Sequence, residues 1–127
     1  MDNERPDREH AYSFYCETYH FFGKKVVAVY FGEERVPAKT WKQVYAIILD
    51  RCNQQCHDML MYLRNKTAGK CRVFLSDSPD SMTRPLKIDE DLYGETHYGS
   101  ATLMHILRER ILSPAGFDYS HILIAFR

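Results

Sequence analysis

The chain has 127 residues, of which 45% are hydrophobic and 27% charged; this composition suits one folded domain and excludes a mostly disordered protein. Seventeen Lys and Arg side chains balance seventeen Asp and Glu side chains, which excludes a strong overall attraction to nucleic acid or to an anionic membrane. No apolar stretch approaches the roughly 20 residues that span a bilayer, and the N-terminus has no apolar leader, so we expect a cytoplasmic protein without a membrane segment.

The first ten residues predict a solvated tail. Seven of them are charged or histidine, so we expect residues 1–10 to be disordered and one domain to occupy residues 11–127. Aromatic side chains then alternate through residues 12–22, which predicts a short strand. Residues 24–31 and 35–38 predict a hairpin around Gly32, in which Pro37 places the second arm at a sheet edge.

The clearest helix begins after Thr40. The Thr40 hydroxyl can cap the first turn, and Gln43 stands where a capping box places Glu or Gln. An apolar stripe follows at helical spacing, runs through Cys52 and Cys56, and continues to about residue 63.

The second half predicts further strands and one more helix. Residues 71–75 and 86–88 predict short strands, residues 89–99 a turn-rich connector, and residues 121–126 a central strand. Ser100 is expected to cap an amphipathic helix that ends at residues 114–116. These elements predict a compact α+β domain, with an antiparallel or mixed sheet of about four or five strands packed on two main amphipathic helices.

A basic stretch follows the first helix and is the strongest candidate for a binding surface. Four cations occur in residues 64–72 with no acidic residue among them, and two more, in and just before the predicted strand at residues 86–88, could join them if that strand lies alongside: Arg64, Lys66, Lys70, Arg72, Arg84 and Lys87. One interpretation is a solvated loop that balances the acidic residues 89–91. The other is a surface that binds a nucleic-acid backbone or an acidic protein face. Tyr15, Tyr19 and Tyr30 are candidate stacking side chains for bases.

The cysteines raise the question of a metal site. Cys52 and Cys56 lie one helical turn apart, and His57 and Cys71 could complete a tetrahedral set. Both helical cysteines lie on the apolar stripe, however, where a thiol behaves as a small hydrophobic side chain. A cytoplasmic chain of this size needs no disulfides. We therefore expect packed thiols and no metal or other cofactor.

Catalytic chemistry has weak support in the sequence. Glu95 and His97 lie two residues apart and could act as base and ligand, and His57 could join them in a small metal-dependent or hydrolytic enzyme. No second histidine at helical spacing supports the set, so this enzyme is kept as the alternative.

Short motifs in residues 40–127 give a family resemblance. They are WKQV (41–44), RVFLS (72–76), RPLKI (84–88), YGET (93–96) and SA (100–101), followed by a terminal apolar strand. In this order they resemble a small uncharacterised bacterial domain that is appended to restriction-type and other phage-defence proteins. The resemblance implies an accessory interaction module in a defence or counter-defence setting, such as an inhibitor of a nucleoprotein complex, and it supplies no catalytic residues. The leading hypothesis is therefore a non-catalytic binding module for nucleic acid or a protein partner, of undetermined oligomeric state.

Overall fold

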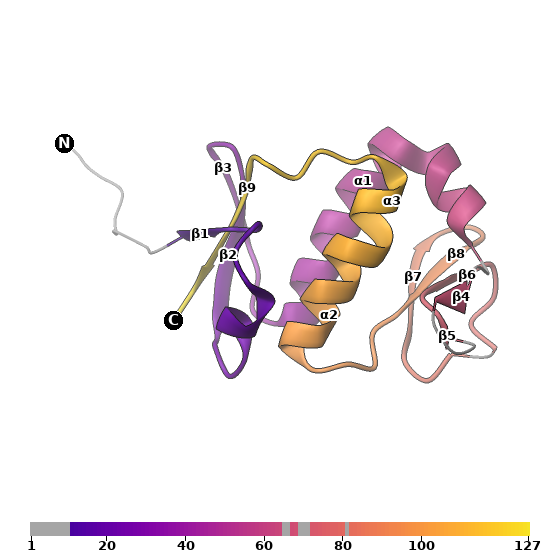
Figure 1. Ribbon diagram of the computed structural model, residues 1–127, viewed down its shortest axis with the longest axis horizontal. Helices are drawn as coiled ribbons and strands as arrows, with labels where there is room; N and C mark the ends of the chain where they lie inside the picture. The colour runs from indigo at the N-terminus through magenta and orange to yellow at the C-terminus, as the bar shows by residue number, and fades with distance from the viewer. Residues whose placement is uncertain (1–10, 65–66, 69–71, 81) are drawn as a thin grey trace.

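The computed structural model describes residues 11–64, 67–68, 72–80 and 82–127, so the predicted tail at residues 1–10 lies outside the described part. The elements form three layers (Figure 1), with a four-stranded sheet on one side, the long helical segments in the middle and a three-stranded sheet on the other side. This arrangement confirms the α+β class. The strands are divided between separate antiparallel sheets, whereas the sequence suggested one sheet.

The four-stranded sheet has the order β1-β9-β2-β3, with β1 at Ala11–Ser13, β2 at Val26–Phe31, β3 at Glu34–Pro37 and β9 at Ile122–Phe126. The predicted hairpin and the central position of the last strand are confirmed. Gly32 makes the tight turn with a φ of 64°, a conformation that favours glycine. The strand expected in residues 12–22 is only three residues long, and a 3-10 turn, η1 (Thr18–Phe21), follows it.

The first helix, α1 (Trp41–Leu63), begins as predicted after Thr40. The Thr40 hydroxyl accepts a hydrogen bond from the Gln43 backbone N–H at 3.1 Å, and the Gln43 side chain accepts one from the Lys39 N–H at 2.7 Å. The first bond satisfies an N–H group that the first turn leaves without a helical partner, and the second ties the residue before the N-cap to the helix. Cys56 has φ −126° and ψ 35°, so the helix is kinked there.

The small sheet has the order β6-β8-β7, with β6 at Leu75–Ser76, β7 at Pro85–Asp89 and β8 at Leu92–Glu95. The sequence interpretation missed β8, which lies inside the predicted connector. The strand predicted at residues 71–75 is divided, because Arg72–Val73 (β5) pairs with Thr67–Ala68 (β4) while β6 pairs with β8.

The second helical segment comprises α2 (Ser100–Ile106), the π-helical η2 (Leu107–Leu112) and α3 (Ser113–Ala115). It ends at Gly116, whose left-handed φ of 76° is typical of a helix terminus. The prediction that Ser100 caps this helix is wrong. Gly99 is the N-cap residue, and the Ser100 hydroxyl instead donates to the Phe21 carbonyl at 3.2 Å.

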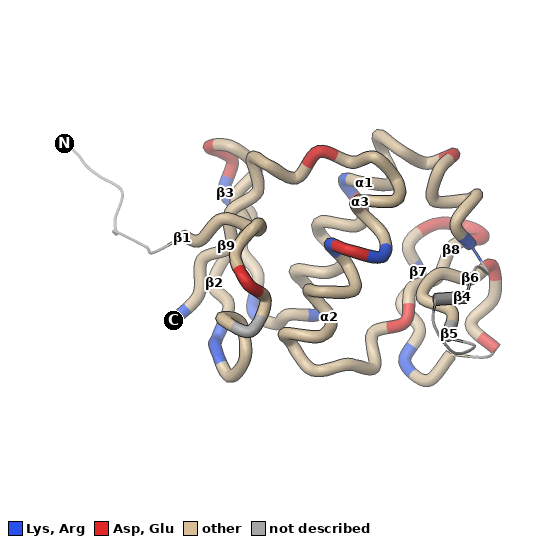
Figure 2. Tube along the Cα trace, in the orientation of Figure 1, with Lys and Arg blue, Asp and Glu red and all other residues tan. Residues whose placement is uncertain are grey.

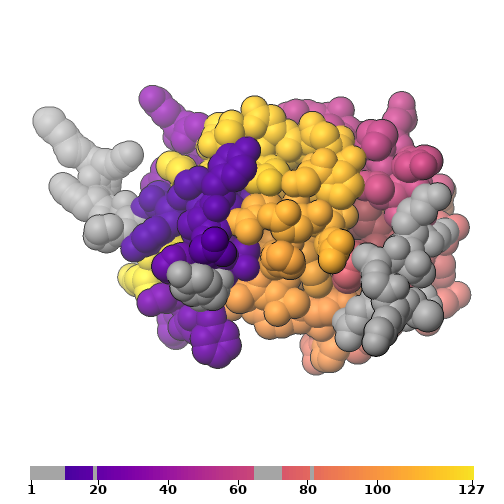
Figure 3. All heavy atoms as spheres, in the orientation of Figure 1, coloured from indigo at the N-terminus to yellow at the C-terminus, as the bar shows by residue number. Residues whose placement is uncertain are grey.

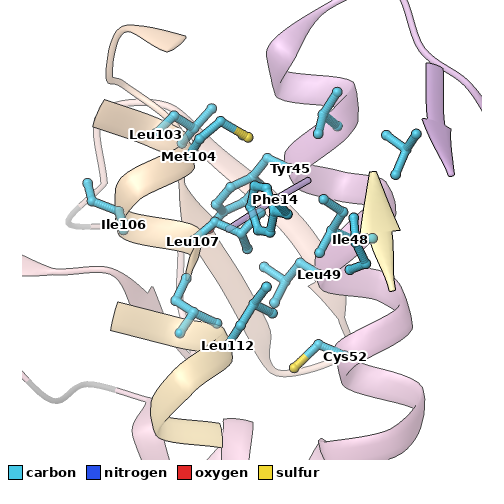
Figure 4. Close-up of a cluster of buried hydrophobic side chains, with 14 of the residues drawn as sticks. Phe14, Tyr45, Ile48, Leu49, Cys52, Leu103, Met104, Ile106, Leu107 and Leu112 are labelled. Atoms are coloured by element: carbon cyan, nitrogen blue, oxygen red, sulfur yellow. The ribbon is translucent and has the colours of Figure 1, made fainter. Parts of the chain in front are cut away.

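One cluster of buried side chains joins the three layers. Figure 4 shows its centre, where Tyr45, Ile48, Leu49 and Cys52 of α1 face side chains of the second helical segment. The cluster also includes Leu75 and Leu92 of the small sheet and Ile122 and Ile124 of the large sheet. Within the described residues, no helix is long and apolar enough to cross a bilayer.

Arg108 connects the second helical segment to the N-terminal segment through hydrogen bonds. Its side chain is buried, and the guanidinium donates to the carbonyl oxygens of Phe14 at 2.9 Å and Cys16 at 2.6 Å. Glu109 accepts a third hydrogen bond at 2.8 Å, so the buried charge is paired. In the space-filling view (Figure 3) the indigo N-terminal segment accordingly lies against the yellow and orange helix.

Candidate functional site

A cavity of about 440 Å³ lies where the starts of both helical segments approach the small sheet. Its lining comes from separate stretches of the chain, namely Trp41 and Lys42 at the start of α1, Arg84 before β7, residues 96–99 after β8, and Leu103 in α2. The cavity therefore depends on the tertiary fold.

Trp41 forms the α1 side of the cavity, and residues of the N-terminal segment and of β9 pack against its ring. Its indole N–H donates to the Lys24 carbonyl at 2.9 Å. Its ring lies against Phe21, at a centroid distance of 5.0 Å, and Phe126, at 6.0 Å. These contacts fix the ring in place and set the position of Lys42, the next residue in the helix.

Glu95 fixes the small-sheet side of the cavity. Its carboxylate accepts hydrogen bonds from the backbone N–H groups of Thr83 and Arg84, both at 2.8 Å, and of His97 at 3.1 Å. The Thr96 hydroxyl donates to the Arg84 carbonyl at 2.8 Å. Together these bonds join the chain that enters β7 to the chain that leaves β8, and so position Arg84 and His97 at the cavity.

The Glu95 carboxylate is stabilised in its charged form. Burial by itself raises the pKa of Glu95. Hydrogen bonds from backbone N–H groups lower this pKa by more than burial raises it, so the pKa lies below the ordinary 4.5; the donors are Arg84, Thr83, His97 and Thr96. The negative charge is directed at backbone N–H groups, which limits its effect on the neighbouring cations.

The cavity lining combines cationic and aromatic side chains. Lys42, Arg84 and His97 supply donors for an anion, and Trp41 and Tyr98 supply rings. The lining contains no Asp or Glu side chain. Within the part of the chain that the structure describes, no salt bridge occupies Lys42 or Arg84. The arrangement suits a planar ligand that carries a phosphate or carboxylate group.

The cavity lies within a longer row of exposed cations that we call the cationic edge: Lys24, Lys25, Lys39, Lys42, Arg84 and Arg127. Two backbone hydrogen bonds, both 2.9 Å long, join Lys25 to Arg127. Figure 2 shows Lys and Arg along the lower edge, from the C-terminus past the turn before β2 and the start of α1 to the loop before β7. Acidic positions lie along the upper edge, in the β2–β3 turn and the loop before β9, and also nearer the cations, just before η1 and at the end of β8.

The basic stretch predicted at residues 64–72 is only partly described. Arg64 is half-buried and ends α1, where its guanidinium donates to the backbone carbonyls of Met61 at 3.3 Å and Asp91 at 2.8 Å. Arg64 therefore closes the helix and ties it to the β7–β8 turn. Lys66 and Lys70 lie outside the described residues.

Of the other predicted binding residues, the structure places Arg84 apart from Arg64. Arg72 lies in β5, and its side chain is not described. Arg84 and Lys87 are both exposed, and Lys87 lies in β7, which pairs with β8. Arg84 lies at the cavity near the start of α1, whereas Arg64 lies at the other end of that helix. Of the predicted set, Arg84 is the residue that joins the cavity.

The helical thiols are packed as predicted. Cys52 is fully buried and Cys56 half-buried, and burial, followed by the adjacent Cys56 thiol, raises the pKa of Cys52 to about 12. The described residues contain no group of three or more His, Cys, Asp or Glu side chains placed to hold a metal ion. Cys71, the remaining member of the alternative metal set, lies outside them.

Of the three residues of the alternative enzyme site, Glu95 and His97 lie together and His57 lies elsewhere. The His57 ring is hydrogen-bonded to the Asn53 side chain at 2.8 Å and lies 3.7 Å from the Asp89 carboxylate. His97 lines the cavity beside Trp41. Trp41 precedes His57 by sixteen residues in α1, a separation of about 24 Å along a helix, so His57 lies far from the cavity. Glu95 is occupied by backbone N–H groups.

Sequence reasoning missed the convergence of Trp41 and Lys42 with Arg84. Lys42 appeared only as part of a helix start, and His97 only as a possible catalytic group. Predicting their proximity requires the pairing of β7 with β8 and the packing of both helix starts, and β8 was not predicted.

The fold and cavity define an α+β protein with a candidate anion-binding site. No family model matches the chain, and neither the curated proteins nor the solved structures contain a match.

Proposed function

We propose that the chain is a non-catalytic binding module that engages the phosphate backbone of a nucleic acid along the cationic edge. The observation that carries the proposal is the convergence of Lys42, Arg84 and His97 around one cavity without an acidic side chain in its lining. In a chain with no net charge, this local group of basic side chains supplies donors for an anion, while the nearby Glu95 charge is hydrogen-bonded to backbone N–H groups. Phosphate contacts of this kind supply sequence-independent affinity and require no reaction.

Salt-dependent binding tests the proposal. A labelled single strand of about ten nucleotides, within the usual site size for such proteins, is titrated at several salt concentrations with the native chain and with Arg84→Ser. The Arg84 side chain makes no described hydrogen bond, whereas its backbone keeps the contacts with Glu95 and Thr96, so the fold should persist. Each lost phosphate contact should reduce the logarithmic salt slope by about 0.7.

Arg110→Ser is the matched control, because it removes the same charge from an exposed position in η2, away from the cavity lining. It should leave the slope unchanged. Equal weakening by both variants, or no binding at low salt, would reject the proposal. If an acidic polypeptide binds at the same residues and nucleic acid does not, the partner is a protein face.

The defence or counter-defence setting is proposed on the sequence resemblance alone. A protein that inhibits a nucleoprotein complex needs a stable scaffold and a complementary charged surface, and the cationic edge supplies such a surface. Recovery of the native chain with a nucleic-acid-containing complex from its host, and loss of that complex with Arg84→Ser, would support this setting. Recovery of the same complex with Arg84→Ser would count against it.

A further inference from the structure

We infer that the cavity holds one unstacked nucleotide of a single strand, with its phosphate against Lys42, Arg84 and His97 and its base against Trp41 and Tyr98. The inference rests on the proposed function and specifies the form of nucleic acid that is bound. It also distinguishes the cavity from the rest of the cationic edge, which would contact phosphates alone.

The size and shape of the site favour a nucleotide. A volume of about 440 Å³ falls within the range of small-ligand cavities, roughly 300–1,000 Å³. A base inside a duplex is stacked and paired, so it can enter such a cavity only after costly extrusion, whereas a base of a single strand is already accessible. The cavity should therefore prefer single strands.

Two cations and one imidazole suit one phosphate group. Lys42 approaches from α1, Arg84 from the loop before β7 and His97 from the segment after β8. The Arg84 guanidinium can offer paired donors to phosphate oxygens, while the Lys42 ammonium acts as a compact charge. Because Glu95 holds the backbone at both Arg84 and His97, little ordering is needed when the ligand binds.

The two rings suit a base. Trp41 is backed by Phe21 and Phe126, and Tyr98 lies edge-on to Phe74 at a centroid distance of 6.3 Å. Rings held in this way present an aromatic surface at low entropic cost, and stacking accepts any base. Leu103 adds an apolar contact to the same lining. An acidic peptide would use the cations but has no base to place against these rings.

Trp41 is the single tryptophan of the chain, so its fluorescence reports on the cavity. We expect a single strand to quench this fluorescence on binding. An abasic strand of equal length, which keeps the phosphates, should bind about tenfold more weakly without the quench. A duplex of equal length should also bind more weakly and without the quench. A nucleoside monophosphate should quench and compete, whereas inorganic phosphate should compete without quenching.

The outcomes separate this inference from the proposed function. If the abasic strand or the duplex binds as well as the normal strand and no ligand quenches Trp41, the inference fails while backbone binding stands. If no nucleic acid binds, both fail. Comparing 5′-phosphorylated with 5′-hydroxyl strands shows which nucleotide of the strand enters the cavity. Tighter binding of the phosphorylated strand indicates a nucleotide at the chain end, and equal affinity indicates an internal nucleotide. Both results support the inference.

A ring substitution provides a second test. Tyr98→Leu should weaken single-strand binding about tenfold and leave abasic-strand binding unchanged. Tyr62→Leu is the control, because Tyr62 is 64% exposed near the far end of α1. Equal single-strand affinity of Tyr98→Leu and the native chain, with both folded by circular dichroism, would overturn the role assigned to this ring.

Discussion

Tyr45 of α1 and Gly94 of the small sheet are closely packed against each other. Tyr45 is fully buried, and within the described part of the chain its hydroxyl has no hydrogen-bond partner. Burial, followed by the nearby Glu95 charge and Tyr98, raises the pKa of Tyr45. A Cβ atom on Gly94 would overlap the Tyr45 hydroxyl oxygen and press on the ring. Gly94 is therefore required for space, since no positive φ is involved.

Paired substitutions test this fit. Gly94→Ala should lower the free energy of unfolding by about 2 kcal/mol through overpacking. Tyr45→Phe should leave it unchanged or raise it by about 1 kcal/mol, because the buried hydroxyl is unpaired. The double variant should recover part of the Gly94→Ala loss, which denaturant titration of all four proteins would measure. Strictly additive effects would show that the two residues do not compete for the same space.

At the scale of elements, Glu95 joins the ends of β7 and β8 and makes stability depend on pH. A carboxylate whose pKa is lowered by folding stabilises the fold above its ordinary value of 4.5, and this contribution is lost as the pH falls through the folded-state pKa. Glu95→Gln should therefore lower the free energy of unfolding by roughly 2 kcal/mol at neutral pH. Towards acid the difference should shrink, because protonated Glu95 resembles Gln.

Denaturant titrations over a pH series would measure this effect. Glu90→Gln is the control, since Glu90 is exposed and its side chain makes no described contact. A difference between Glu95→Gln and the native chain that stays constant from neutral to acid pH would contradict the assigned role.

The elements with strong local signals were predicted from the sequence. The Thr40 cap, the apolar stripe of α1 and the continuous apolar run of β9 follow from local chemistry. The β8 strand was missed because Gly94 and the flanking polar residues are typical of a turn, whereas its strand conformation depends on pairing with β6 and β7. For the site, Arg84 was named, but its partner Lys42 becomes visible only when the helices and small sheet are packed together.

At the scale of the whole molecule, both sheets share one core with the helices between them. Leu92 of β8 and Ile124 of β9 are each fully buried in the same cluster. Neither sheet can cover its apolar face alone, so unfolding one sheet would expose helical side chains that stabilise the other. The cavity, which lies between the helix starts and the small sheet, should therefore persist only while all three layers remain folded.

Cooperative unfolding follows from this shared core. Leu92→Ala should lower the free energy of unfolding by about 3 kcal/mol, and Ile124→Val by about 1 kcal/mol. Trp41 fluorescence reports on the large sheet, because its ring lies 6.0 Å from that of Phe126, while hydrogen exchange of β8 amides reports on the small sheet. In each variant the two signals should shift together along the denaturant axis. If in Leu92→Ala the β8 amides exchange freely while Trp41 keeps its native fluorescence, the small sheet unfolds independently and the cavity is the junction of two separate units.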